Sequence, residues 1–366
     1  MMQGRLEVPE SLQRMRAKGV RRSALERMPK WLICIPLTVQ WLLLSLRYGS
    51  LTLPSAANPG ITSGGLVGEG KLEYFSRMGP LARATIVTYC AVATGEPASR
   101  RSLYNVMKNA GLLFPVIAKP DLGLCGYGVR LLADMGELIR YFEGFPKNET
   151  FLLQQYLPQE GEAGIFYIRD PDTDESQVNG LALRYFPQVR GDGIQTIAQL
   201  IAGDQRASRL LDSALHECRH DGKRVPAAGE VVRLATIGST RVGGLYRDGA
   251  KYITPELAAA IDAIARDMLD FHFGRFDVRF DSLQALSAGR GFTIMEINGA
   301  GSEAIQAWDP NTRLLKGFMM IFRKQSTLFA TGSAMRRRGV KPIGVLELFR
   351  LNQRQQRLIE AYPLSN

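Results

Sequence analysis

Two neighbouring segments constrain the fold most, because together they read as a pair of adjacent strands. In the first, GRFDVRFDS (274–282), charged residues at the odd positions alternate with the apolar Phe276, Val278 and Phe280. One face of this strand therefore belongs to a core and the other is charged. The second, FTIMEINGAG (292–301), follows after the short connection LQALSAGRG. The pattern predicts an antiparallel hairpin.

The hairpin contains a set of oxygen ligands. Regular alternation would place Glu296 on the same face as Ile294 and Asn298, where an unpaired carboxylate would be costly. Pairing of the two strands would bring Asp277 close to Glu296 and Asn298. Two carboxylates and an amide oxygen suit Mg²⁺, which commonly binds through one or two carboxylates plus substrate phosphates. The alternative is a solvated charged face with cross-strand ion pairs.

Two arginines share the charged face with Asp277. Arg275 and Arg279 lie two residues to either side of it along the strand. Guanidinium groups beside a metal site would stabilise the charge of a phosphoryl group during transfer.

The segment FPVIAKPDLGLCGYGVRLL (114–132) indicates a phosphate-binding loop. An apolar strand ends at Lys119, and the loop that follows contains Gly123, Gly126 and Gly128. Glycines let backbone N–H groups approach phosphate oxygens closely, and a lysine supplies a point charge. The alternative is a tight hairpin whose lysine stem lies along apolar surface.

The segment FLLQQYLPQEGEAGIFYIR (151–169) predicts a strand, a break and a second strand, with Glu162 just inside the second. The exposed edge of the first strand would offer backbone N–H and C=O groups to a purine. The carboxylate would accept hydrogen bonds from ribose hydroxyls. An ordinary hairpin with a surface glutamate explains these residues equally well.

These segments, in this order, resemble the ATP-grasp superfamily. The hairpin with its glycines is similar to the metal-binding end of D-alanine–D-alanine ligases. The segments VRGDGIQTIAQLI (189–201) and VPAAGEVVRL (225–234) are similar to parts of cyanophycin synthetase and bifunctional glutathione synthetases. The resemblance covers about residues 111 to 312. It implies an α+β ATP-grasp fold in which two α/β lobes close on ATP.

The resemblance also implies the cofactors and the site residues. The cofactors are ATP and Mg²⁺, with two ions bound and Mn²⁺ as a possible substitute. The resemblance implies that the phosphates contact Lys119, Gly123, Gly126 and Gly128, and that the adenine contacts the hinge residues Gln154, Gln155, Tyr156 and Leu157. It implies that the ribose contacts Glu162 and that the phosphoryl group contacts the catalytic Arg275 and Arg279. The implied metal ligands are Asp277, Glu296 and Asn298.

Three features depart from the usual pattern of this family. Gln154 stands where the hinge usually has a glutamate, and GAGSEA (299–304) replaces a serine-proline-glycine turn. The region before residue 111 is too short for the complete α/β domain that normally precedes the lobes. Since that domain helps to bind the first substrate, the carboxylate substrate is the least predictable part.

The expected organisation has five parts. They are a basic and apolar N-terminal segment (1–50), a short α/β region (51–111), a small ATP-grasp lobe (112–190), a large lobe with the Mg²⁺ site (191–330) and a basic helical tail (331–366). Within the second part, GSLTLPSAANPGITSGGLVGEG (49–70) reads as an irregular linker, because it is rich in Gly, Pro and Ser and lacks the spacing of a phosphate loop.

The run WLICIPLTVQWLLLSL (31–46) is strongly apolar and follows a basic segment. It is shorter than the roughly 20 residues of a usual membrane span and contains Pro36 and Gln40. We therefore expect a helix that either lies on a membrane surface or docks on the protein's own core. A cleaved signal peptide is disfavoured, since no small-residue cleavage site follows the apolar run.

The composition limits the classes of partner that this protein is expected to bind. The net charge of +11 suits an anionic partner, but no basic patch interleaved with aromatic residues supports nucleic-acid binding. The four cysteines are scattered without a CxxC pair, as in a reducing compartment. The segment HECRH (216–220) matches a zinc-protease pattern, but DGKRVP ends the helix at once.

The function implied by the resemblance is ATP-dependent ligation of a small carboxylate, such as an amino acid or peptide, to an amine through an acylphosphate. We expect a cytoplasmic protein, with the inner face of the cell membrane as a further partner. The alternative is a membrane-associated ATP-binding protein without ligase turnover.

Overall fold

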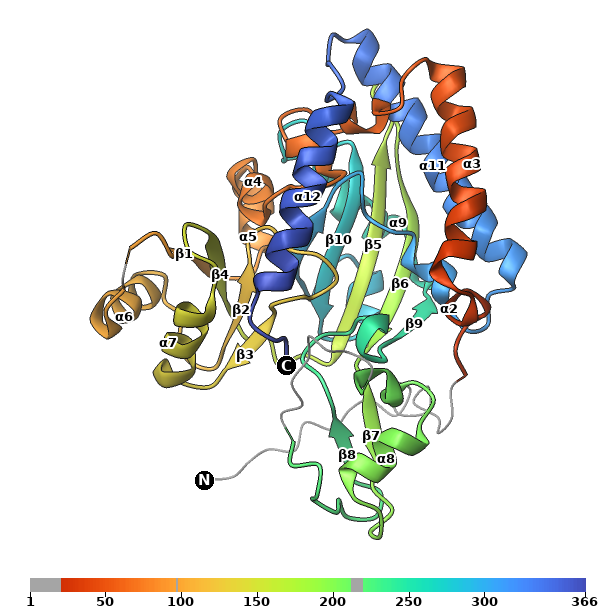
Figure 1. Cartoon of the computed structure of the whole chain (residues 1–366). Helices are drawn as coiled ribbons and strands as arrows, with labels where there is room; N and C mark the ends of the chain where they lie inside the picture. Colours follow the sequence, from red (N-terminus) through yellow and green to blue (C-terminus); the bar gives the residue numbers. More distant parts are fainter. Residues whose placement is uncertain (1–20, 97, 212–219) are drawn as a thin grey trace.

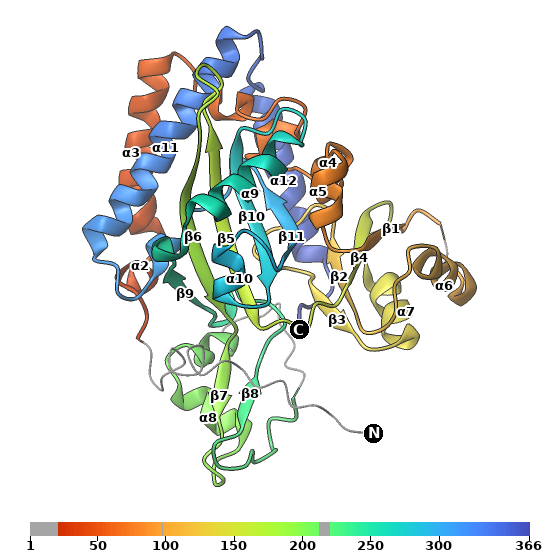
Figure 2. The ribbon, with the colours of Figure 1, turned by 180° about the vertical axis from the view of Figure 1, so that it is seen from behind.

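The computed structural model describes residues 21–96, 98–211 and 220–366. Within them, the strands form antiparallel sheets of four, five and two strands. Figure 1 shows the first two sheets side by side with the two-stranded sheet below, and Figure 2 shows the molecule from behind. The predicted α+β class is confirmed, and so is the helix in the apolar N-terminal run.

The helices frame these sheets. Their bounds are α2 Ala24–Arg27, α3 Lys30–Tyr48, α4 Lys71–Ser76, α5 Pro80–Thr85, α6 Arg100–Asn109, α7 Met135–Gly144, α8 Ile197–Gly203, α9 Pro255–Arg266, α10 Leu283–Ser287, α11 Leu314–Arg337 and α12 Val345–Ala361.

The four-stranded sheet has the order β1 (Tyr89–Ala93), β4 (Thr150–Gln155), β2 (Val116–Pro120), β3 (Arg130–Leu132). Helices α6 and α7 pack beside it, and each begins at a capping side chain. Ser99 accepts a hydrogen bond from the backbone N–H of Ser102, and Asp134 accepts one from Glu137. The apolar residues of the strands and both helices share one core. This core positions β2 and β4, which bound the pocket described below.

The five-stranded sheet has the order β11 (Phe292–Asn298), β10 (Phe273–Phe280), β5 (Gly161–Arg169), β6 (Ser176–Tyr185), β9 (Leu245–Asp248). Phe276, Val278 and Phe280 of β10 face the largest core, together with Leu257 and Ile261 of α9. Figure 2 shows α9 and α10 over this face, and Figure 1 shows α12 crossing in front of the opposite face. Side chains on that opposite face line the pocket described below.

The two-stranded sheet is an insertion between β6 and β9. It pairs β7 (Gln188–Arg190) with β8 (Val231–Arg233), and α8 packs on it in a small core of its own. These elements hold the two segments that resemble cyanophycin and glutathione synthetases.

The sheets divide the chain differently from the lobe boundaries we expected. Strand β1 (89–93) joins the four-stranded sheet, although it precedes residue 112. Strands β5 and β6 lie in the five-stranded sheet, although they precede residue 191. The change of sheet therefore comes after β4, near residue 156. Antiparallel strands separated by long insertions pair through contacts that no local pattern reveals.

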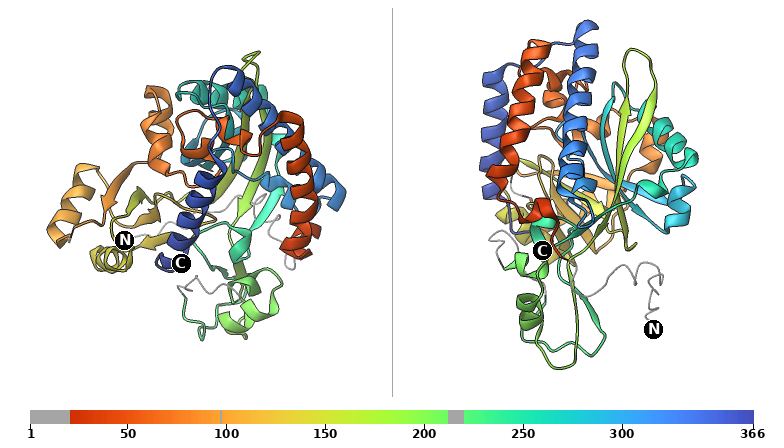
Figure 3. Two further views of the ribbon diagram at one scale, coloured as in Figure 1. Left: turned by 45° about the horizontal axis from the view of Figure 1, so that its top comes forward. Right: turned by 90° about the vertical axis from the view of Figure 1, so that its right-hand side faces the viewer.

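Helix α3 is long and apolar enough, by length and composition, to cross a membrane, and it is the one such helix among the described residues. Figures 1 and 3 show it lying along α11 on the outside of the molecule. Gln40 points inward and donates to the carbonyl of Phe322 at 2.9 Å. We expected this helix either to lie on a membrane surface or to dock on the protein. The structure shows that one face of the helix docks on the protein.

Candidate active site

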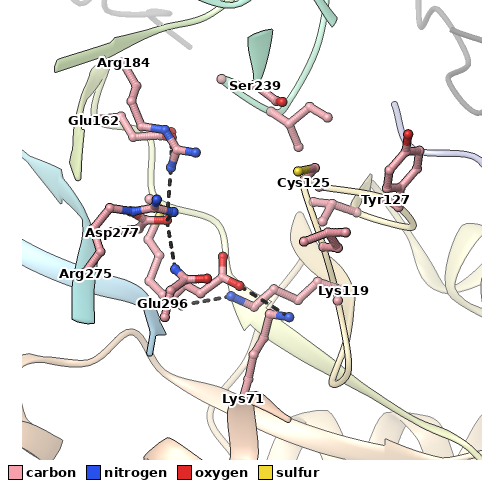
Figure 4. A pocket seen from close by; sticks show the side chains of 18 of the residues that line it. Lys71, Lys119, Cys125, Tyr127, Glu162, Arg184, Ser239, Arg275, Asp277 and Glu296 are labelled. Atoms are coloured by element: carbon pink, nitrogen blue, oxygen red, sulfur yellow. Dashed lines mark hydrogen bonds and ion pairs between the residues drawn. The ribbon is translucent and has the colours of Figure 1, made fainter. Parts of the chain in front are cut away.

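A single pocket between the two larger sheets holds most of the predicted site residues. Strands β2 and β4 contribute one wall, and β10 and β11 contribute the other. The loops 66–71, 123–129, 236–239 and 301–303 close its ends. Figure 4 shows that charged side chains from both walls point into this space.

Pairing of β10 with β11 brings the predicted metal ligands together. Asp277 lies opposite Glu296, and Arg275 lies opposite Asn298. The side-chain amide of Asn298 donates to Asp277 Oδ2 at 3.2 Å. The predicted hairpin and the predicted faces of β10 are confirmed, although the charged face is buried in the pocket rather than solvated.

The expected face of Glu296 was wrong, because β11 contains a bulge. Val278 pairs with Ile294 whereas Asp277 pairs with Glu296, so Met295 is an extra residue. The bulge separates Ile294, which faces the core, from Glu296, which faces the pocket. Glu296 is therefore not embedded in an apolar face, and 32% of its side chain is exposed. Ile297, expected on the opposite face, also lies in the core.

Asp277 lies at the centre of an ion-pair cluster. It accepts from Arg275 Nε at 2.6 Å and from Arg275 Nη2 at 3.0 Å, and Arg184 Nη1 lies 3.2 Å from its Oδ2. Burial favours the neutral acid, but the two guanidinium groups outweigh it and keep the pKa of Asp277 below its usual range. Asp277 is thus an anion at neutral pH.

Glu162, at the start of β5, extends this cluster. Its Oε1 lies 3.2 Å from Arg184 Nη1, and its Oε2 lies 3.3 Å from Arg279 Nη2. The series Arg279, Glu162, Arg184, Asp277, Arg275 therefore alternates in sign across β10, β5 and β6. Since each buried charge has an opposite neighbour, the cluster tolerates its burial. The ribose contact expected of Glu162 remains a prediction.

Two lysines face this cluster, Lys119 from the other wall and Lys71 from the start of α4 (Figure 4). Lys119 on β2 donates to the carbonyl of Met295 at 2.8 Å, and Gln154 on β4 donates to the same oxygen at 3.2 Å. Lys71 lies 3.4 Å from Glu296. Burial lowers the pKa of Lys119 to about 7, although Glu296 opposes that shift. An incoming anion would restore its positive charge.

The glycine loop after β2 bounds the pocket, and most of its predicted residues line it. Gly123 and Gly126 do so, whereas Gly128 lies behind them against Pro120 and Tyr362. Gly126 has φ of 77°, a conformation that favours glycine. The hinge residues Gln154, Gln155, Tyr156 and Leu157 also line the pocket.

Sequence reasoning missed four charged residues of the pocket, one of which, Glu303, follows the glycines after β11. Glu69 comes from the segment interpreted as a linker, Lys71 begins helix α4 directly after it, and Arg184 comes from β6. Oε2 of Glu69 is buried without a hydrogen-bond partner among the described residues, and burial raises the pKa of Glu69 to about 7. Arg184 had a signal, because an arginine interrupts the apolar run GLALRYF of its strand. Lys71 and Glu69 had none beyond the nearby glycines.

The metal prediction rests on two carboxylates and one amide. Among the described residues no three His, Cys, Asp or Glu side chains form a metal-binding group. The oxygen donors of Asp277, Glu296 and Asn298 fit Mg²⁺ on condition that substrate phosphates complete its coordination. For the zinc pattern, His216 lies outside the described residues, and His220 is hydrogen-bonded to the carbonyl of Arg233 at 2.7 Å.

The comparisons with known proteins concern the fold. No protein-family model matches the chain, and no curated protein matches its sequence. The structure is similar to a bifunctional glutathione synthetase from Pasteurella multocida, at 16% identity and a TM-score of 0.35 over 69% of this chain. It is also similar to D-alanine–D-alanine ligase from Bacillus anthracis, at 14% identity and a TM-score of 0.40, covering 76% of this chain and 71% of that one.

A third similar structure is that of the D-cycloserine synthetase DcsG, at 13% identity and a TM-score of 0.37, covering 73% of this chain and 69% of that one. The chain spans only 36% of the glutathione synthetase. At these identities and TM-scores, the functional inference has to come from the pocket itself.

Proposed function

We propose that this protein is an ATP-dependent carboxylate–amine ligase. The observation that carries the proposal is one pocket in which Lys119, the glycine loop and the hinge face the Asp277–Glu296 pair and its arginines. A phosphate-binding wall opposite a set of hard oxygen ligands is the arrangement that phosphoryl transfer requires.

One wall of the pocket would bind the nucleotide, and the other would bind the phosphoryl group. The hinge 154–157 would bind the adenine, and Lys119 would meet the phosphates at the end of β2. Arg275 and Arg279 would stabilise the phosphoryl group, together with Arg184, which already bridges Asp277 and Glu162. Asp277, Glu296 and Asn298 would hold Mg²⁺, which neutralises phosphate oxygens when bound.

The reaction then proceeds in two steps. A substrate carboxylate oxygen attacks the γ-phosphorus of ATP, the bond to the β–γ bridging oxygen breaks, and ADP leaves. The amine nitrogen attacks the acyl carbon of the acylphosphate, the C–N bond forms, and phosphate leaves as the amine gives up a proton. The cationic side chains act mainly by positioning and charge stabilisation.

The substrates proposed are small carboxylates and amines such as amino acids or peptides, and nucleic acid is not among the partners. The similar D-alanine–D-alanine ligase acts on an amino acid by its name. We place the protein in the cytoplasm, where ATP is abundant. Cys34, Cys90 and Cys125 are free thiols in the described chain, which suits a reducing compartment.

A second candidate is an ATP-binding protein without turnover. It is favoured by the saturation of Asp277, which already accepts from Arg275, Arg184 and Asn298. A metal ion would have to compete with these partners for the carboxylate.

Trapping with hydroxylamine separates the two candidates. The protein is incubated with Mg-ATP, hydroxylamine and a panel of amino acids and dipeptides, and hydroxamate and ADP are measured. The ligase proposal expects both products for at least one carboxylate, and it expects Arg275→Gln to abolish them. Arg290→Gln, an exposed arginine in the connection before β11, is the matched control. Nucleotide binding without ADP or hydroxamate for any member would support the second candidate.

A further inference from the structure

Helix α3 has an inner face that is fixed to the protein. Ile33 packs in a core with Leu25 and Ala307, and farther along Leu44 packs with Leu53 and Phe329. Both core contacts bury these side chains almost completely. The apolar residues of the inner face are thus accounted for by the protein itself.

Two side chains with polar groups in the middle of α3, Gln40 and Trp41, also point inward, whereas Thr38 is exposed. Gln40 donates to the carbonyl of Phe322 at 2.9 Å and to Ser326 Oγ at 3.1 Å, both on α11. Trp41 Nε1 donates to the carbonyl of Leu51 at 3.0 Å. For a helix on a soluble surface the opposite orientation is expected, with polar groups toward water.

The outer face of α3 is apolar along almost its whole length. Its large side chains are exposed to the following extents: Trp31 66%, Leu32 38%, Ile35 51%, Val39 52%, Leu42 50%, Leu43 62% and Leu46 79%. Their spacing of three and four residues makes one continuous stripe. Leu315 and Met319 are also exposed, to 72% and 44%, on α11, which packs along α3. Contiguous apolar surface of this kind marks an interaction site.

The charged residues of α3 and α11 themselves are all positive. Neither α3 nor α11 contains an aspartate or glutamate. Lys30 and Arg47 bracket the stripe at the two ends of α3, and both are exposed. Arg336 of α11 donates to the carbonyl of Tyr48 and so reinforces the second end. Such a rim complements an anionic surface.

We propose that α3 lies in the plane of an anionic lipid bilayer, with the stripe immersed at the boundary between headgroups and acyl chains. Cationic rims and an apolar face with a tryptophan are the features by which helices bind membrane interfaces. This attachment goes beyond the ligase function and does not depend on it.

The structure favours this occupant over two others. A spanning helix would need its partner α11 to enter the hydrocarbon, but α11 carries the exposed Lys316 and Arg323. A second copy of the chain would bring the cationic ends of two α3 helices together, and like charges oppose association. A negatively charged surface satisfies both the stripe and its rim.

Sedimentation of the full chain with vesicles tests the proposal. The protein should pellet with vesicles of phosphatidylcholine and phosphatidylglycerol, much less with phosphatidylcholine alone, and high salt should release it. Emission of Trp31 should shift to the blue on binding, and Trp31→Phe should remove that shift. Arg47→Gln should weaken binding about fivefold, as expected for the loss of one interfacial cation.

Matched variants locate the binding face. Leu43→Glu combined with Leu46→Glu should abolish pelleting, because both side chains belong to the stripe. Leu113→Glu combined with Ile194→Glu should not, although these residues are exposed to 81% and 82% on other parts of the molecule. Equal pelleting of the two double variants, or none by the unmodified chain, would overturn the proposal.

Two further outcomes would also overturn it. Retention in the pellet after an alkaline carbonate wash would show a spanning helix. A dimer in light scattering without lipid, dissociated by the Leu43 and Leu46 substitutions, would assign the stripe to a second copy of the chain.

Discussion

At the scale of single residues, charge balance governs the pocket. Glu296 does not depend on a metal ion to be tolerated, since it lies 3.4 Å from Lys71 and is partly exposed to the pocket. Lys71 and Lys119 outweigh the effect of burial and lower the pKa of Glu296. Its role is therefore to be sought in ligand binding rather than in stability.

Glu296→Gln keeps the shape of the side chain and removes one charge. We expect a folded protein whose turnover falls by orders of magnitude, since an amide is a weaker Mg²⁺ ligand than a carboxylate. Calorimetry of ATP binding with and without Mg²⁺ tests this cause, because the Mg²⁺ dependence of ATP binding should disappear in the variant. The control is Asp281→Asn, at an exposed residue that is hydrogen-bonded to Gln159. It should leave turnover and the Mg²⁺ dependence of ATP binding nearly unchanged. Equal losses in the two variants would refute the assignment.

His272, away from the pocket, makes the unfolding free energy depend on pH. Burial and the nearby Arg169 lower its pKa to about 4, from an ordinary value near 6.5. Because the unfolded state then binds more protons than the folded state, the stability due to His272 is complete above pH 6.5 and is lost as the pH falls toward 4. Between pH 7 and pH 5 this loss is about 2 kcal/mol.

His272→Gln should remove this dependence. The free energy of unfolding is measured with urea at pH 5 and pH 7 for both proteins. The change between the two pH values is then compared between wild type and variant. The comparison is needed because Glu69, whose pKa is raised to about 7, changes stability in the opposite direction over the same range. A wild-type and a variant curve with the same pH dependence would contradict the prediction.

At the scale of elements, the bulge in β11 and the end of the chain shape the pocket. The bulge frees the carbonyl of Met295, which accepts from Lys119 and Gln154 and so links β11 to the opposite wall. The segment after α12 holds the glycine loop, since Tyr362 donates to the carbonyl of Leu122 at 2.6 Å and stacks on Phe145.

Tyr362→Phe tests the hold on this loop, because it keeps the stacking and removes one hydrogen bond. A net loss of about 1 kcal/mol should speed hydrogen exchange in the loop 122–128 about fivefold and raise the KM for ATP. Hydrogen-exchange mass spectrometry measures the first effect. The exposed Tyr104 on α6 supplies the control Tyr104→Phe. Unchanged exchange in 122–128 would show that the loop does not depend on this contact.

At the scale of the whole molecule, the pocket joins two lobes with separate cores. A ligand that contacts both should stabilise the folded state by mass action, by about 2.7 kcal/mol at a hundredfold excess over Kd. We therefore expect Mg-ATP to raise the Tm in differential scanning calorimetry. Lys119→Ala should abolish most of the rise, and Lys147→Ala, exposed on the same lobe, should not. An equal rise in both variants would remove Lys119 from the nucleotide site.

The sequence by itself determined the features that repeat locally. The strict alternation in 274–282 predicted both faces of β10, and the hairpin with β11 brought Asp277 to Glu296 as expected. A glycine loop after a strand that ends in lysine likewise predicted one wall of the pocket. Alternation and turn chemistry depend on neighbours in the chain, so a single sequence reveals them.

The tertiary structure alone decided what depends on distant contacts. The bulge at Met295 reversed the expected face of Glu296, since the register with β10 requires one extra residue there. Lys71 and Arg184 reached the pocket through packing of segments far apart in sequence. The helix at 30–48 was predictable from its composition, but which of its faces meets the protein followed only from its contacts with α11. Each of these outcomes is set by long-range pairing, which local periodicity does not encode.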